Sequence, residues 1–434
     1  MIKVLKFGGT SVGSAENMKK VASIIKNEGS RITVLSAMSG TTDSLVKIGN
    51  LAKDNNSAGI DNIIGQLREK YSNCINSLLK LPSEGIAKME DTFGLIKNFA
   101  ANYEEGKSER GILAQGELLT SYIFAGYLKE SGENAVLLNA PDFMITDKDG
   151  KVNKDILKSR LSALTKNDGV FYITQGFICT NANDEIDNLG RGGSDYSAAL
   201  MGEAICADEV QIWTDIDGMH NNDPRYVDRT IPIRQMSFDE AAELAYFGAK
   251  ILHPATIQPC KDHGIHVRLK NTMDPEAEGT LIANGEASSD FCAVAAKDNI
   301  TVIRIYSARM LMAYGFLRKV FEIFENNKTS IDMITTSEVA VSLTIDDDSN
   351  LDKIKKELES LGTIEIEKKN SIICVVGRVD HEQAGMTARV FNSLYTIPVK
   401  MISYGASHRS IVLLIDTENK IQALKNLNVG LFNL

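Results

Sequence analysis

The sequence lacks any stretch of about 18 uncharged apolar residues, the length that a membrane-spanning helix needs. We therefore expect no membrane span. We also expect no secretory signal, because Lys3, Lys6 and Gly8 interrupt the first residues before an apolar segment of useful length can form. The expected location is the cytoplasm.

Basic blocks are missing as well. The 434 residues carry a formal net charge of −10, and lysine and arginine form no cluster along the chain. Nucleic acids and anionic membranes attract clustered positive charge, so we expect neither as a main partner. Small molecules are the expected ligands.

Cysteine is scarce and scattered. The six cysteines stand singly, without a CxxC pair and without histidine at ligand spacing. In a chain of this length that is expected in the cytoplasm, this pattern predicts free and mostly buried thiols. No metal site built from protein side chains is expected.

Short apolar runs alternate with segments of helical periodicity through the first two thirds of the chain. The runs are IKVLKF, RITVLSA, NAVLLNA, GVFYITQGF, EVQIWTDI and HVRL. This alternation predicts an α/β fold with a largely parallel sheet. Ligands are then expected at the carboxyl ends of the strands.

The last third of the sequence repeats at an offset of 70 residues. Residues 315–346 align without a gap with residues 385–416, since 385 − 315 = 416 − 346 = 70. Each unit is predicted to run strand, helix, two strands, helix, strand. Two such βαββαβ units indicate a duplicated small-ligand sensor, because a solenoid needs at least three repeats. The polar segment 271–289 is the expected domain boundary.

The segment KFGGTS follows the first predicted strand. Gly8 and Gly9 allow backbone N–H groups to approach a phosphate, Lys6 adds a mobile charge, and Ser14 is the expected N-cap of the next helix. The lysine precedes the glycines, unlike in the two common phosphate-binding fingerprints. An ordinary strand–turn–helix corner is therefore the alternative.

The segment LGRGGSDYSAAL places a second candidate anion site before a helix. Arg191 can bind a carboxylate in a bidentate manner, next to a glycine pair, Ser194 and Asp195. A glycine turn with a surface arginine is the alternative. Two anion sites would suit a reaction between two anions.

Two later segments carry further candidate cations. In TDIDGMHNNDPR, Arg225 is placed to reach a phosphate, or else to form a surface ion pair within its loop. In FGAKILHPAT, Lys250 and Ile251 lie in a predicted helix, where a solvated lysine is the alternative.

Six segments in this order resemble the signatures of the aspartate kinases in the amino-acid kinase superfamily. They are KFGGTSV, SAMSGTTD, AQGELLT, LGRGGSDYSAAL, TDIDGMHNNDPR and FGAKILHPAT, and the repeated units resemble tandem ACT domains. The resemblance runs nearly end to end and implies the amino-acid kinase fold, with helices on both faces of the sheet. It implies a catalytic domain over 1–285 and ACT repeats over 300–370 and 371–434.

The resemblance implies a monofunctional, lysine-sensitive enzyme that transfers the γ-phosphate of ATP to the side-chain carboxylate of L-aspartate. The product would be 4-phospho-L-aspartate, on the route to lysine, threonine and methionine. Mg²⁺ would be bound mainly through phosphate oxygens and water. Assembly into a homodimer or homotetramer through the ACT units is implied as well.

The resemblance also implies roles for individual residues. The catalytic pair would be Lys6 and Asp195, and the aspartate contacts Ser36, Thr42, Glu117, Arg191 and Ser194. The nucleotide contacts would be Gly8, Gly9, Ser11, Thr214, Asp215, His220, Arg225, Lys250 and Ile251. Effector contacts would be Met310, Gly315, Asp332, Thr336, Ser337 and Glu338. Many members of the family have tyrosine or phenylalanine where this chain has His220.

Several alternatives stay open at this point. The chain could act on another acidic amino acid, or it could be a non-catalytic sensor with a vestigial kinase domain. Its length leads us to expect no fused dehydrogenase. The second repeat has Ile402 and His408 in place of Asp332 and Glu338, so only the first repeat is expected to bind a dibasic amino acid. Threonine is the alternative effector.

Overall fold

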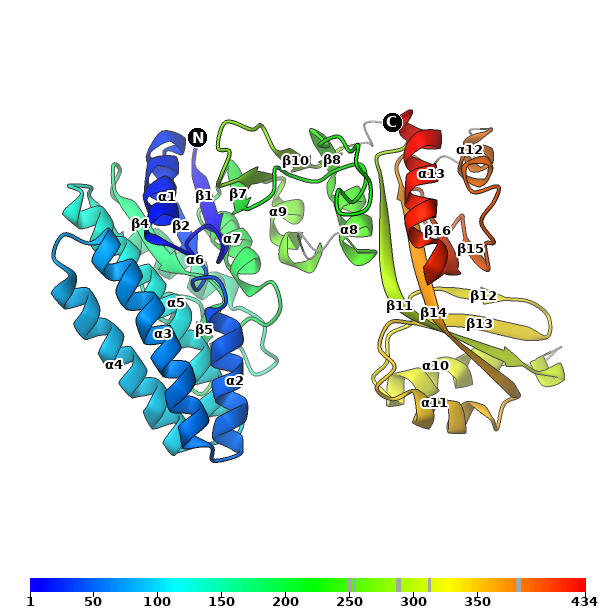
Figure 1. Cartoon of the computed structure of the whole chain (residues 1–434), viewed down its shortest axis with the longest axis horizontal. Coiled ribbons are helices and arrows are strands. Elements are labelled where there is room, and N and C mark those ends of the chain that lie inside the picture. Colours follow the sequence, from blue (N-terminus) through cyan, green and yellow to red (C-terminus); the bar gives the residue numbers. More distant parts are fainter. Residues whose placement is uncertain (249–251, 253, 286–289, 311–313, 380–383) are drawn as a thin grey trace. The chain divides into compact units, whose positions relative to one another are not determined.

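The structure is a computed structural model that describes all residues except 249–251, 253, 286–289, 311–313 and 380–383 (Figure 1). It divides into two compact units, the first with Met1–Met219 and Leu252–Asn284, the second with His220–Ile251 and Gly285–Leu434. The second unit thus includes a segment that precedes the expected domain boundary. The bounds predicted from the sequence follow chain order and stay a prediction.

A largely parallel sheet forms the centre of the first unit, as predicted. Its strands are β1 (Lys3–Phe7), β2 (Ile32–Leu35), β3 (Ala135–Leu137), β4 (Phe171–Gln175), β7 (Glu209–Thr214), β9 (His266–Asn271) and β10 (Thr280–Ala283). Within this unit they lie in the order β3-β4-β2-β1-β7-β9-β10. The neighbours from β3 to β9 are parallel, and β10 is antiparallel to β9. A small antiparallel pair, β5 (Ile178–Thr180) and β6 (Ile186–Asn188), stands apart from this sheet.

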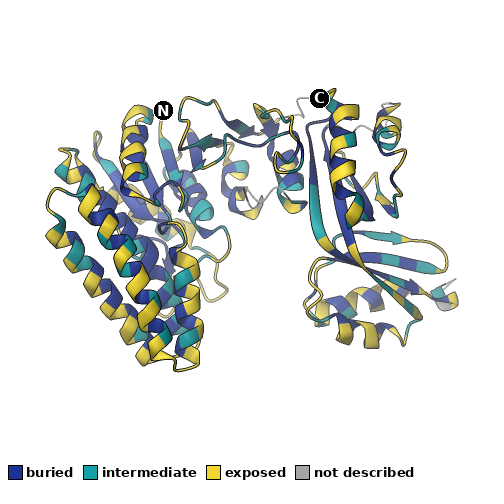
Figure 2. Cartoon of the chain, viewed as in Figure 1, coloured by how far each residue is buried: buried dark blue, intermediate teal, exposed yellow. Residues whose placement is uncertain are grey.

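The apolar runs form strands because both faces of a parallel sheet are covered. Val4, Leu5 and Phe7 of β1 have no exposed surface, and all four residues of β2 are buried. Figure 2 shows the strands of this unit buried and the outward faces of its helices exposed.

Eight helices of the first unit are described. They are α1 (Ala15–Glu28), α2 (Thr41–Lys53), α3 (Ser57–Leu78), α4 (Pro82–Ala101), α5 (Lys107–Glu130), α6 (Lys154–Leu164), α7 (Gly193–Ala204) and α9 (Gln258–His263). The Ser14 side chain accepts a hydrogen bond from Asn17 N, which confirms the predicted cap of α1. Helices α3, α4 and α5 pack side by side (Figure 1). Among the described residues, no helix is long and apolar enough to cross a membrane.

The second unit contains the repeated region and the segment before it. Its elements are β8 (Gln235–Ser237), α8 (Phe238–Tyr246), β11 (Ala293–Tyr306), α10 (Phe316–Asn326), β12 (Ile334–Thr336), β13 (Ala340–Ile345), α11 (Leu351–Leu358), β14 (Thr363–Val376), α12 (Met386–Ser393), β15 (Met401–Ser403), β16 (Ser410–Asp416) and α13 (Lys420–Phe432). The repeats share one antiparallel sheet in the order β12-β13-β11-β14-β16-β15.

The two repeats are joined by their long strands. The first repeat has the predicted strand–helix–strand–strand–helix–strand order, from β11 to β14. The second repeat has the same order through its second helix, α13, but its closing strand is the first half of β11. Ala293–Lys297 of that half pair with Ile372–Val376 of β14. One strand can serve both repeats because β11 is 14 residues long and changes register after Lys297.

Each repeat has its own apolar core. The first is built around Val320, Phe324 and Leu343, and the second around Val390, Leu413 and Leu427. Tyr226 and Val227, from the segment before the repeats, pack into the second core.

Candidate active site

Strands β1, β2 and β7 end side by side in the first unit. Because they are parallel neighbours, the loops that follow them meet at one edge of the sheet. Gly8 N donates to the Trp213 carbonyl at 3.0 Å, and Ser39 N donates to the Gly9 carbonyl at 3.0 Å. The segments KFGGTS and SAMSGTT, predicted to act together, are therefore in direct contact.

An ion pair joins the end of β1 to the start of α7. Lys6 Nζ lies 2.6 Å from Asp195 Oδ1, and both side chains are largely buried. Apart from Lys6, Asp195 Oδ1 has no partner among the described residues. An ammonium group has three N–H donors, so Lys6 keeps donors for other acceptors while it is paired with Asp195.

Glycine is required at two positions around this pair. A Cβ atom on Gly9 would lie 2.9 Å from the Ala37 carbonyl oxygen, closer than real Cβ atoms come. Gly192 precedes α7 with φ 72°, in the left-handed region that favours glycine. These two residues allow the loops after β1 and before α7 to take their conformations.

Ser36 and Ser194 meet across the same edge. The Ser36 hydroxyl donates to the Ser194 hydroxyl at 3.0 Å. Ser36 follows β2 and Ser194 lies in the first turn of α7, so the second anion segment contacts SAMSGTTD here and contacts the first anion segment through Lys6 and Asp195.

Glu117 is a buried carboxyl group without a cation. It lies within α5, is 4% exposed, and its Oε1 accepts from Ala37 N at 3.2 Å. Its Oε2 is buried and has no hydrogen-bond partner among the described residues. Burial raises the pKa of Glu117 to about 7, despite the Ala37 N–H bond, because the charged form is deprived of water.

The other residues predicted to contact aspartate lie at the surface. Arg191 and Thr42 are exposed, and within the described part of the chain Arg191 has no hydrogen bond or ion pair. Their roles stay predictions.

Five residues predicted to contact the nucleotide belong to the first unit, namely Gly8, Gly9, Ser11, Thr214 and Asp215. Ser11 is buried, and its hydroxyl bonds to Thr272 Oγ1 at 2.7 Å and to the Trp213 carbonyl at 3.4 Å, so it is already used inside the fold. Thr214 ends β7, and its hydroxyl donates to Asp215 at 3.0 Å.

The remaining nucleotide candidates belong to the second unit. Arg225 pairs with Asp223 at 2.6 Å, which matches the surface ion pair named as its alternative. The His220 ring bonds to the Thr230 hydroxyl at 2.8 Å. Lys250 and Ile251 lie outside the described residues, so their predicted roles have no structural description.

The predicted effector residues surround the start of α10 and the β12–β13 turn. Thr336, Ser337 and Glu338 are exposed at that turn, and Gly315 is the N-cap of α10 with φ 82°. Met310 is half-buried before it.

Asp332 differs from these surface residues because its side chain is 1% exposed. Lys297 Nζ lies 2.8 Å from its Oδ1, and the Tyr246 hydroxyl donates to the same oxygen at 3.0 Å. Burial raises the pKa of Asp332, and its Oδ2 lacks a hydrogen-bond partner among the described residues. Sequence reasoning missed Lys297 and Tyr246, which are far from Asp332 in the chain and show no motif.

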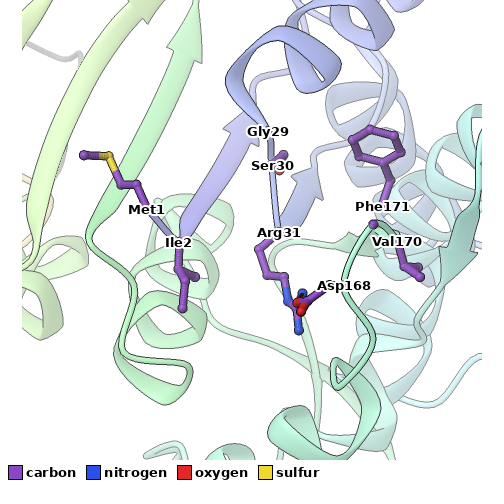
Figure 3. Close-up of a pocket in the computed structure, with 9 residues that line it drawn as sticks. Met1, Ile2, Gly29, Ser30, Arg31, Asp168, Val170 and Phe171 are labelled. Atoms are coloured by element: carbon purple, nitrogen blue, oxygen red, sulfur yellow. Dashed lines mark hydrogen bonds and ion pairs between the residues drawn. The ribbon is translucent and has the colours of Figure 1, made fainter.

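A separate pocket of about 350 Å³ lies at the amino ends of β1, β2 and β4 (Figure 3). Its lining includes Ile2 and Phe171, and Arg31 pairs there with Asp168 at 2.6 Å. Since parallel strands place their two ends at opposite edges, this pocket is remote from Lys6 and Asp195. Among the described residues, no group of three or more His, Cys, Asp or Glu could hold a metal ion.

Comparison with known families matches both parts of the chain. Residues 1–271 match the amino acid kinase family, and residues 373–430 match the ACT domain.

Individual relatives are similar over almost the whole chain. Chloroplastic aspartokinase 1 of Arabidopsis thaliana is 36% identical over 97% of this chain and 79% of its own length. The crystal structure of E. coli aspartokinase III with aspartate and ADP, called the R-state, has a TM-score of 0.87 and 33% identity over 100% of both chains. The same enzyme with lysine and aspartate, called the T-state, has a TM-score of 0.83 and 34% identity over 99% of both chains.

The raised pKa of Glu117 predicts a pH-dependent cost in stability. Folding raises this pKa from 4.5 to about 7, so the folded chain binds the proton more tightly and loses stability as pH rises through that window. Glu117→Gln removes the effect. Its free energy of unfolding should therefore rise relative to the wild type between about pH 4.5 and 7, by a few kcal/mol at most, and stay level above.

Urea denaturation at several pH values measures this difference. Trp213, the single tryptophan, is buried in the first unit and reports its unfolding by fluorescence. Glu16→Gln, at a carboxylate that is 79% exposed, is the matched control and should show no such trend. A Glu117→Gln difference that is constant with pH would contradict the prediction.

Proposed function

Since this chain belongs to the amino acid kinase family and, within it, to the aspartokinases, we propose that it transfers the γ-phosphate of ATP to the side-chain carboxylate of L-aspartate. The product is 4-phospho-L-aspartate. One observation supports this proposal: Lys6 and the buried Glu117, whose Oε2 has no hydrogen-bond partner among the described residues, lie on elements around one sheet edge. The Lys6 ammonium suits a phosphate, and the Glu117 carboxyl suits an ammonium group.

The chemistry requires no general base. An aspartate side chain has an unperturbed pKa of about 3.9, so it is already ionised at neutral pH and can attack phosphorus directly. The barrier comes from bringing one anion up to another. The protein must therefore supply positive charge and in-line alignment.

Lys6 and the glycines act on the phosphate side. Lys6 places its ammonium over the transferring group, while the backbone N–H groups near Gly8 and Gly9 receive phosphate oxygens. Asp195 holds Lys6 in place by Coulomb attraction at 2.6 Å. The ammonium has three N–H groups, so those not directed at Asp195 reach the phosphate.

Mg²⁺ fits this arrangement as a companion of ATP. When bound, it would neutralise part of the negative charge of the phosphates. Asp195, whose side chain is largely buried beside Lys6, would hold the ion through a water molecule. The phosphates and water would supply most of the other ligands.

The amino acid is recognised by opposite charges at its two ends. Glu117 receives the α-ammonium, which supplies the donor that Oε2 lacks, and Arg191 receives the α-carboxylate. Ser36, Ser194 and Thr42 offer hydroxyl groups to the substrate's carboxylates. Thr214, Asp215, His220, Arg225, Lys250 and Ile251 serve the nucleotide by resemblance to the family.

Lysine is the proposed feedback inhibitor, as the lysine complex of the E. coli relative supports. The effector's ammonium would donate to Asp332 Oδ2, and the hydroxyls of Thr336 and Ser337 lie exposed nearby in the chain. By linkage, lysine inhibits only if it binds a less active arrangement more tightly than the active one.

Assembly through the repeats is proposed as well. Strands β12 and β15 lie at the two edges of the shared sheet, where unpaired backbone groups can bind a partner. A homodimer and a homotetramer both fit this description. The cytoplasm is the proposed location.

The assignment of Arg191 tests the proposed reaction. Arg191→Ala should raise the KM for aspartate by about 10- to 100-fold, because a charge-assisted contact is lost, and leave the KM for ATP nearly unchanged. Hydroxylamine trapping of the acyl phosphate identifies the product. Equal weakening of ATP binding would place Arg191 on the phosphates, and a wild-type protein without aspartate-dependent ADP formation would refute the function.

The effector site is tested at an exposed position. Thr336→Met should abolish inhibition by lysine and leave the uninhibited rate within about twofold, because Thr336 is exposed and belongs to the second unit, whereas Lys6 belongs to the first. Ala406→Met is the matched control, since 336 + 70 = 406 places it at the equivalent, exposed position of the second repeat. Wild-type enzyme that responds to threonine and ignores millimolar lysine would contradict the choice of effector.

A further inference from the structure

One face of α13 contacts the loop that contains His220 and Arg225. The residues Lys420, Leu424 and Asn428 are spaced by four, which places them in one row along the helix. All three contact the segment Asn221–Arg229. The loop is therefore attached along two turns of the last helix of the second repeat.

Asn428 lies at the centre of the contact between α13 and the loop. Its side-chain oxygen accepts from Asn221 Nδ2 at 3.1 Å and from Asn222 Nδ2 at 3.3 Å. Its own Nδ2 donates to the Arg229 carbonyl at 2.8 Å. The three asparagine residues are 1–2% exposed, so these bonds are shielded from water.

Backbone partners fix the orientation of the amides. Asn221 Oδ1 accepts from Ile231 N at 2.7 Å, so its NH₂ group must face Asn428. Asn222 Nδ2 also donates to the Leu424 carbonyl at 2.9 Å. The network thus has a single consistent set of donors and acceptors.

Lys420 holds the other end of the loop. Its ammonium lies 4.1 Å from the centre of the Tyr226 ring and 2.6 Å from Asp298 Oδ2. Tyr226 in turn lies beside the Arg225 guanidinium, at 5.7 Å. Val227 is buried in the core of the second repeat.

These contacts give the second repeat a task other than effector binding. It has Ile402 and His408 where the first repeat has Asp332 and Glu338. We propose that Asn428, with Lys420, is a positioning residue for nucleotide binding, because it fixes the loop of His220 and Arg225 in the conformation that ATP requires. The proposal rests on the proposed function of that loop.

Steady-state kinetics of the full chain test this role. Asn428→Ala should raise the KM for ATP by about three- to tenfold and leave the KM for aspartate and kcat within about twofold, because only the nucleotide loop loses its anchor. Asn426→Ala is the matched control: it lies on the same helix, and within the described part of the chain its side chain bonds only to Gln422 of that helix, at 2.7 Å. It should change neither KM.

A double variant tests whether Asn428 acts through the loop. Asn222→Ala alone should also raise the KM for ATP, and combining it with Asn428→Ala should add little, because both remove one shared contact. If the factors by which the two single substitutions raise the KM for ATP multiply fully in the double variant, Asn428 does not act through Asn222, and that result would overturn the proposed role. Trp213 fluorescence and circular dichroism check that each variant is folded.

Lys420→Met is a second variant that tests the same role if Asn428→Ala does not fold. It removes the charge over Tyr226 and should likewise raise the KM for ATP selectively. Folded variants at either position with an unchanged KM for ATP would overturn the proposal. A failure of the proposed function looks different, since the wild type would then show no aspartate-dependent turnover.

Discussion

The repulsion between two anions is the constraint on which this structure depends. A carboxylate and a triphosphate must approach to bonding distance, so fixed positive charge has to stand where they meet. Lys6 can supply it because β1 is flanked on both sides by parallel strands, with Lys6 in register with Val34 and Ile212. Asp195 then holds the cation in place by an ion pair of 2.6 Å.

At Glu117, the physical effect that matters is burial, which raises the pKa of the carboxyl group. Glu117 is 4% exposed and has no cationic partner among the described residues, and its burial raises its pKa to about 7. An ammonium group that bound there would stabilise the ionised form and bring that pKa down. The same desolvation that costs stability in the free protein would therefore favour a cationic ligand at the proposed site.

In the second unit, buried hydrogen bonds hold a loop in place. The segment with His220 and Arg225 packs with the second repeat, where Asn428 satisfies its buried amides. Both repeats share one antiparallel sheet through the long strands β11 and β14. The predicted effector residues of the first repeat and the helix α13 that contacts this loop thus belong to repeats that share one continuous sheet.

Much of this could be predicted from the sequence. The apolar runs predicted the parallel sheet, and the offset of 70 residues predicted the two repeats. The motifs predicted that Lys6 and Asp195 act as a pair, and the structure confirms that their side chains are in contact. Contacts between residues about 200 apart, such as Asn222 with Asn428, have no periodic signal and could not be found. The long β11 and the Lys297–Asp332 pair likewise depend on tertiary packing, whereas the local Arg225–Asp223 pair matches the surface ion pair expected as the alternative for Arg225.

The central claim, that Lys6 supplies the charge for phosphoryl transfer, is tested most directly by the single-turnover rate of Lys6→Ala with saturating ATP and aspartate. A preorganised charge on the transferring group is worth about 3–4 kcal/mol, so the rate should fall by about 10²–10³-fold or more while the fold is intact. A loss of less than about tenfold in a folded variant would contradict the account.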